Sequence, residues 1–541
     1  MLHALGPMAL AAVLSAAPVQ SGASPGEPLA EREERLELFR DLVAAIRERH
    51  AFSEQTEKNL GRAWSDHLPG LEAEFAAAST PEALTAAVWH LQNSLHDRHC
   101  FFFAKDPGAW LTLGFEAQVE WVEDKPVFFV ARIIDPGIAG AISPGDLLQE
   151  LGGVPADRFL EAFELVSNAN NPRGIAHDVA AHLGSRLGAL SGAREGEAVP
   201  ARFSSRATGA SISTTLSWRR PPPPRPRTTS PNGPIDYDSA ACANLPEPGY
   251  GPYSLQERGI RWCLYTSRQA PYDAHPIVRQ LSFDYTSGPG PAAHLLRAER
   301  RWLELALAAL PAARGVILDL RENTGGNDAA WFLDWWAPGP YANHFVDFVL
   351  YRDFERFRQA NPAGFSGRDL GLYRGALESR APGQRFWRHQ PFFGRPEGCG
   401  PDQRCVPAHR VTSLPVALLV GPRCMSACDS FAQIFRENRF GPLVGEPPSA
   451  AYSLRAELPV TLPRSRRRIG VLHLAFSREQ SGRTGEYLEG RLLELDQPLP
   501  RTFENRERYG QALVDAALRA FAADASSAEP EAAGEVDSSP R

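Results

Sequence analysis

The sequence predicts a soluble, multidomain α/β protein, and three observations indicate this fold class. The chain has 541 residues, which is several times the length of a single domain. Apolar residues make up 43% of it and charged residues 22%, which is the balance of ordinary globular proteins. Short apolar runs, typical of buried strands, alternate with amphipathic helical patterns, as in an α/β core. After residue 25 no apolar run reaches the roughly 20 residues that a membrane-crossing helix needs.

The composition also excludes several classes of protein. A disordered regulator, a collagen and a coiled coil would each have a very different composition. The formal net charge is −7, so the chain has no overall basic field for nucleic acid or anionic lipid. Lysine occurs only at Lys58, Lys105 and Lys125. This scarcity limits which catalytic bases the chain can use.

The N-terminus resembles an export signal. An apolar stretch from Met8 to Val19 precedes small residues, with a small-x-small cleavage site at Ser21-Gly22-Ala23. The segment before the stretch lacks lysine and arginine, so a frayed, alanine-rich terminus is the alternative. No cysteine lies directly after the stretch, and a lipoprotein anchor is therefore not expected. We predict a signal peptide over residues 1–23 and a periplasmic or secreted bacterial protein.

The seven cysteines agree with an oxidising compartment. Cys399 and Cys405 bracket a short polar loop, which predicts a turn closed by a disulfide. Cys242 and Cys263 could close a proline-rich insertion in the same way. The full connectivity and the leftover thiol cannot be deduced from the sequence.

The first part of the mature chain predicts a small helical module over residues 28–111. Apolar residues recur at helical spacing over residues 31–49, 57–78 and 81–95. Thr80 is a candidate N-cap for the last of these helices.

A β-rich domain is predicted over residues 112–217, because the apolar pattern changes there to that of strands (113–115, 119–122 and 126–134). Residues 140–155 contain Pro-Gly-Asp, a short apolar strand and a Gly-Gly turn, and they resemble the core of a PDZ domain. A generic strand-turn-strand segment is the alternative. The resemblance implies a loop whose backbone N–H groups bind the C-terminus of a peptide, beside a strand edge that accepts the peptide. The loop residues are Leu113, Gly114 and Phe115.

The remaining chain predicts an insertion, an α/β core and a tail. Residues 218–258 are rich in proline and glycine, typical of a linker or surface insertion. Residues 259–522 form the core, and residues 523–541 are too polar to fold by themselves. Within the core we expect an amphipathic helix over 292–310 and a strand over 277–283. Three short apolar runs, over 315–320, 414–420 and 442–445, predict strands buried on both faces.

The most informative segment runs from Pro422 to Phe431. It follows a buried strand and leads into a helical pattern, so Ser426 is expected at a helix start. Backbone N–H groups and the positive end of the helix dipole gather there. That position suits a nucleophile whose reaction generates an oxyanion. Taken alone, however, a serine at a helix start is more often only a helix cap.

A second segment, Asp319 to Gly326, reads Asp-x-Arg-x-Asn-x-Gly-Gly and also follows a buried strand. About a hundred residues later come Ser-Ala-x-Asp and then Val-Gly-Glu-Pro. In this order the motifs resemble the tail-specific, or C-terminal-processing, serine peptidases. That family also contains tricorn protease and the interphotoreceptor retinoid-binding proteins. The resemblance spans the helical module, the PDZ-like domain and the core, and implies a core of the ClpP/crotonase-like type.

The resemblance implies that Ser426 is the nucleophile. Ala427 would supply one oxyanion N–H group, and Gly325 or Gly326 would supply the other. The tail-specific branch takes its base from a lysine about 25 residues after the serine. The corresponding stretch of this chain has no lysine and none follows Lys125, so a Ser–Lys dyad at that position is excluded.

The tricorn-like branch takes its base from a Leu-x-Asp-x-His motif, which the segment Leu95 to His99 matches. His99 is therefore the expected base, with His96 as the alternative, and activity should rise with pH through an apparent pKa of about 6–7. Tricorn has a serine before its histidine, whereas this chain has Arg98. The segment from His96 to Cys100 is also the nearest approach to a metal motif, but its spacing is not that of a usual ligand set. We expect no metal and no cofactor.

The same branch adds a late glutamate that orients the base, and Glu489 is its counterpart here, with Glu486 as the alternative. The sequence therefore predicts an exported serine endopeptidase that works through an acyl-enzyme on peptides or unfolded proteins. Nucleic-acid partners and stable membrane insertion are not expected. A non-catalytic binding protein on the same fold is the alternative. An α/β-hydrolase is disfavoured, because the predicted core over residues 259–522 has no Gly-x-Ser-x-Gly elbow.

Overall fold

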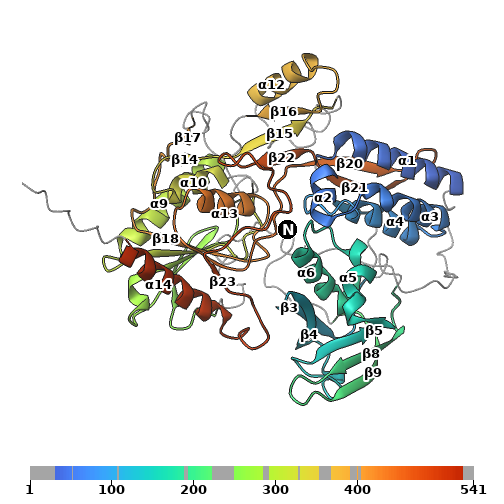
Figure 1. Ribbon diagram of the computed structural model, residues 1–541, viewed down its shortest axis with the longest axis horizontal. Coiled ribbons are helices and arrows are strands. Elements are labelled where there is room, and N and C mark those ends of the chain that lie inside the picture. Colours follow the sequence, from blue (N-terminus) through green and yellow to red (C-terminus); the bar gives the residue numbers. More distant parts are fainter. Residues whose placement is uncertain are drawn as a thin grey trace, which may run out of the picture.

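A computed structural model describes residues 31–51, 53–105, 109–187, 193–221, 249–283, 292–326, 329–351, 367–389, 399 and 404–527. The expected signal peptide lies outside these residues, as do most of the proline-rich insertion and the last part of the tail. None of the described helices is long and apolar enough to cross a membrane. In Figure 1 a large sheet with its helices lies on the left, N-terminal helices lie on the right, and a second, β-rich unit lies below them.

The N-terminal region is helical, as its apolar spacing predicts. The helix expected over residues 57–78 is broken, because Gly61 adopts a φ of +71° after α2 and Pro69 opens a new helix, α3. Thr80 caps α4, since its hydroxyl oxygen accepts a hydrogen bond from the N–H of Ala83 at 3.1 Å. The elements are α1 (Arg32–Arg49), α2 (Ser53–Leu60), η1 (Trp64–Asp66), α3 (Leu68–Ala77) and α4 (Pro81–Asn93).

A three-stranded sheet joins this helical region to a segment near the other end of the chain. Its strands are ordered β1-β21-β20, with β1 (Phe101–Ala104) antiparallel to β21 (Arg468–Ala475) and β20 (Arg455–Thr461) at the far edge. Because β1 begins two residues after His99, this pairing fixes the position of the histidine relative to the C-terminal part of the chain.

The β-rich unit is an antiparallel sheet with strands in the order β3-β4-β5-β8-β9, and β6 pairs with β5. The apolar residues 113–115 do not form one strand, because Gly114, with a φ of +91°, separates β2 from β3. Helix α6 packs against β3. The strands are β2 (Trp110–Thr112), β3 (Phe115–Val122), β4 (Lys125–Ile133), β5 (Leu147–Leu151), β6 (Val154–Pro155), β7 (Ser185–Leu187), β8 (Ala198–Ser204) and β9 (Ser211–Ser217). The helices are η2 (Pro136–Ile138), η3 (Ala156–Arg158), α5 (Phe159–Ala162), η4 (Glu164–Val166) and α6 (Pro172–Leu183).

A seven-stranded sheet ordered β10-β11-β12-β13-β18-β19-β23 forms the core of the α/β region. The strands from β12 to β23 are parallel, and β10 and β11 add an antiparallel edge. They are β10 (Ser254–Arg258), β11 (Trp262–Thr266), β12 (Ile277–Gln280), β13 (Val316–Asp319), β18 (Val416–Val420), β19 (Leu443–Gly445) and β23 (Gln497–Pro498). A short helix, η5 (Tyr272–Ala274), precedes β12.

Helices cover both faces of this sheet, so its central strands are buried on both sides. Successive side chains of β13 point to opposite faces of the sheet. Leu318 packs with the helices on one face (α9, α10 and α13), whereas Ile317 packs with α14 on the other face. Both side chains are fully buried, as the continuous apolar runs of these strands predict. The helices are α9 (Ala292–Ala308), α10 (Ala329–Trp336), α13 (Ala427–Glu437) and α14 (Tyr509–Ser527).

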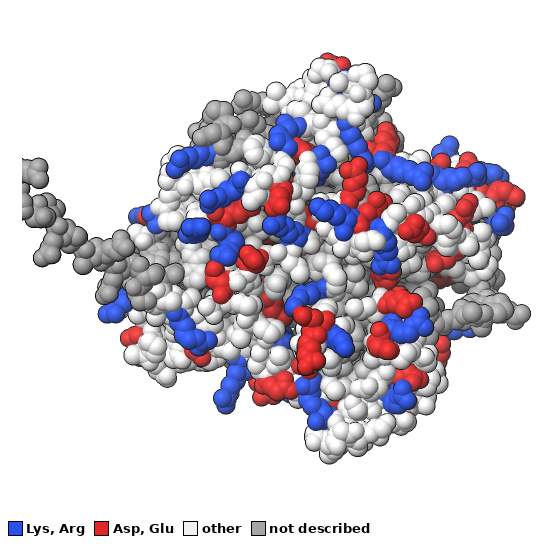
Figure 2. Space-filling model, viewed as in Figure 1, with Lys and Arg blue, Asp and Glu red and all other residues white. Residues whose placement is uncertain are grey.

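Smaller elements complete the described chain. Helix α14 runs to Ser527, so the first five residues of the expected polar tail are helical, and β10 lies inside the expected insertion. The remaining elements are β14 (Tyr341–Ala342), β15 (Phe345–Val349), α12 (Gly367–Glu378), β16 (Phe386–His389), β17 (Arg404–Cys405) and β22 (Ser477–Gln480). On the face drawn in Figure 2, positive and negative side chains are interspersed, as the modest net charge predicts.

Candidate active site

Ser426 lies between the buried strand β18 and helix α13, as its sequence context predicts. Its backbone has φ 62° and ψ −125°, a conformation that residues other than glycine rarely adopt. The turn before it is tied to its surroundings. The N–H of Cys424 donates to the carbonyl of Gly421 at 2.9 Å, and that of Met425 donates to the carbonyl of Asn323 at 3.2 Å. Ser426 is therefore held at a fixed place, and its side chain is half-buried.

Asp429, one turn into α13, supports the backbone around Ser426. Its buried carboxylate accepts hydrogen bonds from the N–H of Ser426 at 2.9 Å and from the hydroxyl of Ser449 at 2.8 Å. The N–H groups of Ala450 and Ala451 donate to it as well, at 2.8 and 3.1 Å. Burial raises the pKa of Asp429 to about 7, although these four donors favour the carboxylate.

His99 lies between α4 and β1 and reaches Ser426. The Nε2 atom of His99 and the Oγ atom of Ser426 are 2.9 Å apart, a hydrogen-bond distance. For the hydroxyl to donate, Nε2 must be unprotonated and the ring proton must lie on Nδ1. Within the described part of the chain, Nδ1 has no hydrogen-bond partner.

The protonation of His99 differs from the sequence-based expectation. Burial lowers the pKa of His99 to about 4, which Asp97 opposes and Arg455 reinforces. The side chain is therefore neutral at neutral pH. The expected pKa of about 6–7 is too high because it assumed a solvated imidazole.

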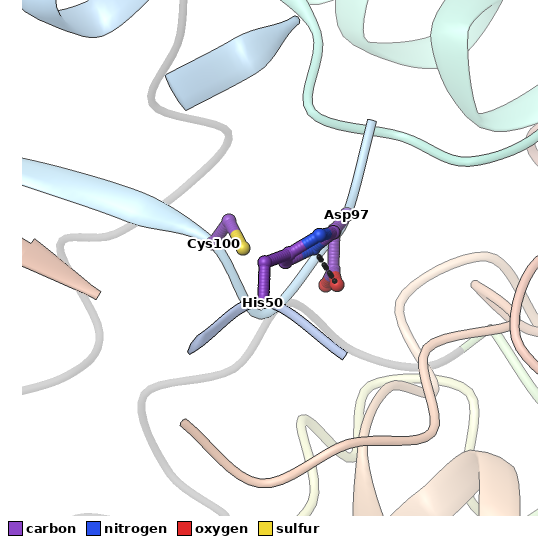
Figure 3. Close-up of side chains that lie close together, drawn as sticks. All are labelled: His50, Asp97 and Cys100. Atoms are coloured by element: carbon purple, nitrogen blue, oxygen red, sulfur yellow. Dashed lines mark hydrogen bonds and ion pairs between the residues drawn. The ribbon is translucent and has the colours of Figure 1, made fainter. Parts of the chain in front are cut away.

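Asp97 supports His99 from within the helical region. One of its carboxylate oxygens accepts the backbone N–H of His99 at 2.8 Å, and the other lies 3.0 Å from Nε2 of His50. Figure 3 shows the side chains of His50, Asp97 and Cys100 grouped together, and the ligand atoms of these buried residues lie within 4.8 Å of one another. Such a group could hold a metal ion. Burial, helped by Asp97, raises the pKa of Cys100 well above its usual range, which disfavours the thiolate that binds metals.

His96, the alternative base, is engaged away from Ser426. Its Nδ1 atom lies 3.0 Å from the carbonyl oxygen of Ala169, and its Nε2 atom lies 2.9 Å from a carboxylate oxygen of Glu164. Burial, reinforced by Arg62, lowers the pKa of His96 to about 3. His96 and Glu164, together with His67, form a second group whose ligand atoms lie close enough to hold a metal ion. The guanidinium of Arg62 already contacts the same carboxylate and supplies a positive charge there.

The two glycines of the Asp319–Gly326 segment play different parts. The N–H of Gly325 donates to Oδ1 of Asn323 at 2.8 Å, so this N–H is not available for an oxyanion in this conformation. Gly325 instead allows close approach: a Cβ atom there would lie 2.6 Å from the carbonyl oxygen of Met425 and 2.9 Å from the Cβ atom of Ser426. Gly326, with a φ of +145°, remains the candidate donor on this side.

Ala427 is the first residue of α13, so its N–H has no acceptor within the helix. It therefore fits the expected role of an oxyanion donor. The polar residues of the Asp-x-Arg-x-Asn motif build the facing loop. Asp319 pairs with Arg321 at 2.7 Å, and although burial opposes ionisation, this guanidinium holds the pKa of Asp319 at about 2. Asn323 bonds to Gly325 and to the carbonyl of Gln280.

Glu489 is fully buried near the base, whereas Glu486 is exposed. The carboxylate of Glu489 accepts the N–H of Tyr452 at 2.7 Å and the side-chain amide of Asn170. Burial raises the pKa of Glu489 well above its usual range, and the charge of Asp97 acts in the same direction. No hydrogen bond in the described structure joins Glu489 to the base. Its support of the base therefore remains a prediction, and Asn170 is a neighbour that sequence reasoning missed.

The loop Leu113–Phe115 lies at the start of the β-rich sheet. The N–H of Leu113 donates to the carbonyl of Gly184 at 2.9 Å, and that of Gly114 donates to the hydroxyl of Thr112 at 3.0 Å. Two of the three N–H groups expected to hold a peptide carboxylate are thus engaged within the domain. Peptide binding by this loop remains a prediction that would require them to be released.

Two disulfides have both of their cysteines among the described residues. Cys399 and Cys405 are bonded, as their bracketing of a polar loop predicts. The sequence interpretation missed the other, which joins Cys424 to Cys428. The signal for it was the placement of two cysteines at equal distances on either side of Ser426.

The sequence left the partner or free state of the other cysteines open. Cys100 is a free, buried thiol. Cys242 lies outside the described residues, so the expected pairing of Cys242 with Cys263 is not described.

Residues 294–471 match the model of peptidase family S41. Among solved structures, mature CPAF is similar with a TM-score of 0.64 and 15% identity, covering 91% of this chain and 97% of that one. The structure of mature CPAF complexed with lactacystin has a TM-score of 0.64 and 16% identity, and the match covers 91% of this chain and 98% of that one. The photosystem II D1 C-terminal processing protease has a TM-score of 0.38 and 12% identity, and the match covers 86% of this chain and 93% of that one. A search of curated proteins finds no match. At these identities the likeness to CPAF shows a shared fold.

Proposed function

We propose that this chain is a serine-type peptidase in which Ser426 is the nucleophile and His99 the general base. The match of residues 294–471 to the model of peptidase family S41 supports this proposal. The observation that carries this assignment is the 2.9 Å contact between Oγ of Ser426 and Nε2 of His99. A hydroxyl is a weak nucleophile at neutral pH and needs an adjacent base to accept its proton. His99 is buried and neutral, so it can accept that proton.

The reaction follows from this geometry. Oγ of Ser426 attacks the carbonyl carbon of the scissile peptide bond while Nε2 of His99 takes the hydroxyl proton. The negative charge that develops on the carbonyl oxygen is stabilised by the N–H groups of Ala427 and Gly326 and by the positive end of α13. The amine leaves with the proton from His99, and the carbonyl carbon stays bonded to Ser426 as an ester. Water then releases the acid in a second round in which His99 is again the base.

Asp97 and Glu489 act through the base in this proposal. Asp97 fixes the backbone of His99, and its charge favours the imidazolium that forms during the reaction. Glu489 lies in the same buried region and supports the walls of the site through Asn170 and Tyr452. Both are positioning residues, because neither contacts Ser426.

We further propose that the enzyme is exported and takes up peptides or unfolded proteins with the help of its β-rich, PDZ-like domain. The two disulfides support export, because disulfides persist mainly in oxidising compartments. The apolar N-terminal stretch supports it as well.

The decisive experiment is labelling with a serine-directed fluorophosphonate, followed by mapping of the adduct. We expect a single adduct on Ser426 in the wild type and none in Ser426→Ala. His99→Ala should be labelled much more slowly, because the nucleophile loses its base. A stable, folded protein that gives no adduct would favour the non-catalytic alternative.

A further inference from the structure

The disulfide between Cys424 and Cys428 surrounds Ser426. It joins the residue two positions before the serine to the residue two positions after it, and the Cα atoms of the two cysteines are 5.2 Å apart. Both half-cystines are fully buried. The bond therefore closes a covalent ring of five residues with Ser426 at its middle.

This ring spans the part of the backbone that most needs to be held. Ser426 has a positive φ, which a side chain with a Cβ atom rarely adopts and which persists only when the surroundings impose it. The same conformation aims Oγ at Nε2 of His99 and places the N–H of Ala427 beside it. A relaxed turn would move the nucleophile and an oxyanion donor together.

The other restraints on the turn are single hydrogen bonds. The N–H of Ser426 donates to Asp429, that of Met425 to Asn323, and that of Cys428 to the carbonyl of Met425 at 3.1 Å. Each of these can open and close locally. The disulfide is the only covalent restraint among them, and it limits the conformations open to the five residues even when a hydrogen bond is broken.

We propose that the Cys424–Cys428 disulfide is a positioning device for catalysis, so that the enzyme has full activity only in its oxidised state. This inference rests on the proposed role of Ser426. It makes the active site itself, and not only the fold, dependent on an oxidising environment. In the reduced state the turn keeps its hydrogen bonds but loses the covalent ring, and the serine spends less time aligned with His99.

The test compares two variants, each of which removes one disulfide. Cys424→Ala/Cys428→Ala removes the ring around the nucleophile. Cys399→Ala/Cys405→Ala is the matched control, because it removes a disulfide of similar span, six residues apart instead of four. For each protein we would measure the rate constant of fluorophosphonate acylation, the number of labelled sites per chain, and kcat and KM for a peptide substrate. The number of labelled sites reports the folded fraction, whereas the rate constant reports alignment of the nucleophile.

We expect the acylation rate constant and kcat of Cys424→Ala/Cys428→Ala to fall about ten- to a hundredfold, the effect of a misplacement of about 1 Å. KM and the control variant should change little. An unchanged rate constant per labelled site would overturn the proposal, whether the variant labels fully or only in part, because the disulfide would then serve stability alone. Failure of the proposed function would look different, since the wild type itself would not be labelled at Ser426.

Discussion

The Oγ atom of Ser426 lies 2.9 Å from the Nε2 atom of His99, although 327 residues separate the two in the chain. The contact depends on the pairing of β1 with β21, which carries the N-terminal helical region to the edge of the α/β core. His99 follows the helical region, and Ser426 directly precedes α13. The catalytic pair is therefore assembled between two parts of the molecule, each of which supplies one member.

Ser426→Ala should abolish peptidase activity and leave the melting temperature almost unchanged. Oγ forms the bond to the substrate, whereas the backbone of the turn is held by contacts that alanine keeps. Loss of a helix-capping hydroxyl costs at most about 0.5–2 kcal/mol. Activity on a peptide substrate and thermal unfolding would both be measured, with the exposed Ser413→Ala as the control. Full activity in purified Ser426→Ala would contradict the assignment.

The pH profile of kcat/KM should show an acid limb near pH 4 that reports His99. The neutral imidazole is the active form, so activity rises as pH increases through the pKa of about 4 and is then constant as far as this group is concerned. Burial also makes the folded state less able than the unfolded state to bind this proton. The contribution of His99 to stability is therefore present above about pH 6.5 and is lost as pH falls through 4.

The profile would be recorded together with circular dichroism, which separates titration of the base from acid unfolding. A limb at pH 6–7 that persists in folded protein would show that His99 is better solvated than its burial implies. His99→Ala should lose about as much activity as Ser426→Ala, because the two residues act as one unit.

Gly325→Ala should lower kcat by about a hundredfold with a folded structure retained. The added Cβ would lie 2.6 Å from the carbonyl of Met425 and 2.9 Å from the Cβ of Ser426, so the nucleophile turn must shift. Gly140→Ala is the control, because nothing lies within 4 Å of the position of its new Cβ. Steady-state kinetics of the two variants make the comparison. Equal activity would show that the turn tolerates the displacement.

Asp429→Asn should destabilise the protein by about 1–3 kcal/mol and reduce its activity. The carboxylate accepts four hydrogen bonds, three of them from backbone N–H groups. An amide has one acceptor atom and one donor atom, so at least one buried N–H loses its partner. Chemical denaturation and kcat would be measured near pH 8, where the wild-type carboxylate is mainly ionised. Unchanged values for both would mean that the carboxylate does not hold the turn.

His344 should make the stability of the protein fall as the pH is raised above neutrality. Burial disfavours its charge, but Glu479 and Glu437 outweigh this and raise its pKa to about 9. A raised histidine pKa contributes stability that is complete below about pH 6.5 and is lost as pH rises through 9. One pKa unit corresponds to about 1.4 kcal/mol, so the contribution is a few kcal/mol.

The measurement is urea unfolding near pH 6 and near pH 9.5 for the wild type and for His344→Gln. The variant should be less stable near pH 6 and should lose less on going to the higher pH. Equal losses in both proteins would assign the pH dependence to other groups.

The sequence by itself determined the local features of this protein. Continuous apolar runs predicted the doubly covered strands β13, β18 and β19, because a strand buried on both faces has no polar side to show. Thr80 before a proline predicted the start of α4. The same local reasoning predicted a serine at the start of α13 and a histidine in a short motif, and the absence of later lysines removed one catalytic base.

Only the tertiary structure decided how these groups meet and what charge they carry. The hydrogen bond of Asn323 to Gly325 left Gly326 as the oxyanion candidate, and the burial of His99 moved its pKa from near 6.5 to about 4. The tertiary structure also decided that Cys424 and Cys428 form a disulfide around Ser426. Distance, burial and hydrogen-bond partners come from segments far apart in the chain, so local spacing in the sequence does not contain them. A residue's type and neighbours fix its chemistry, whereas its reactivity is set by the dielectric and the charges that folding places around it.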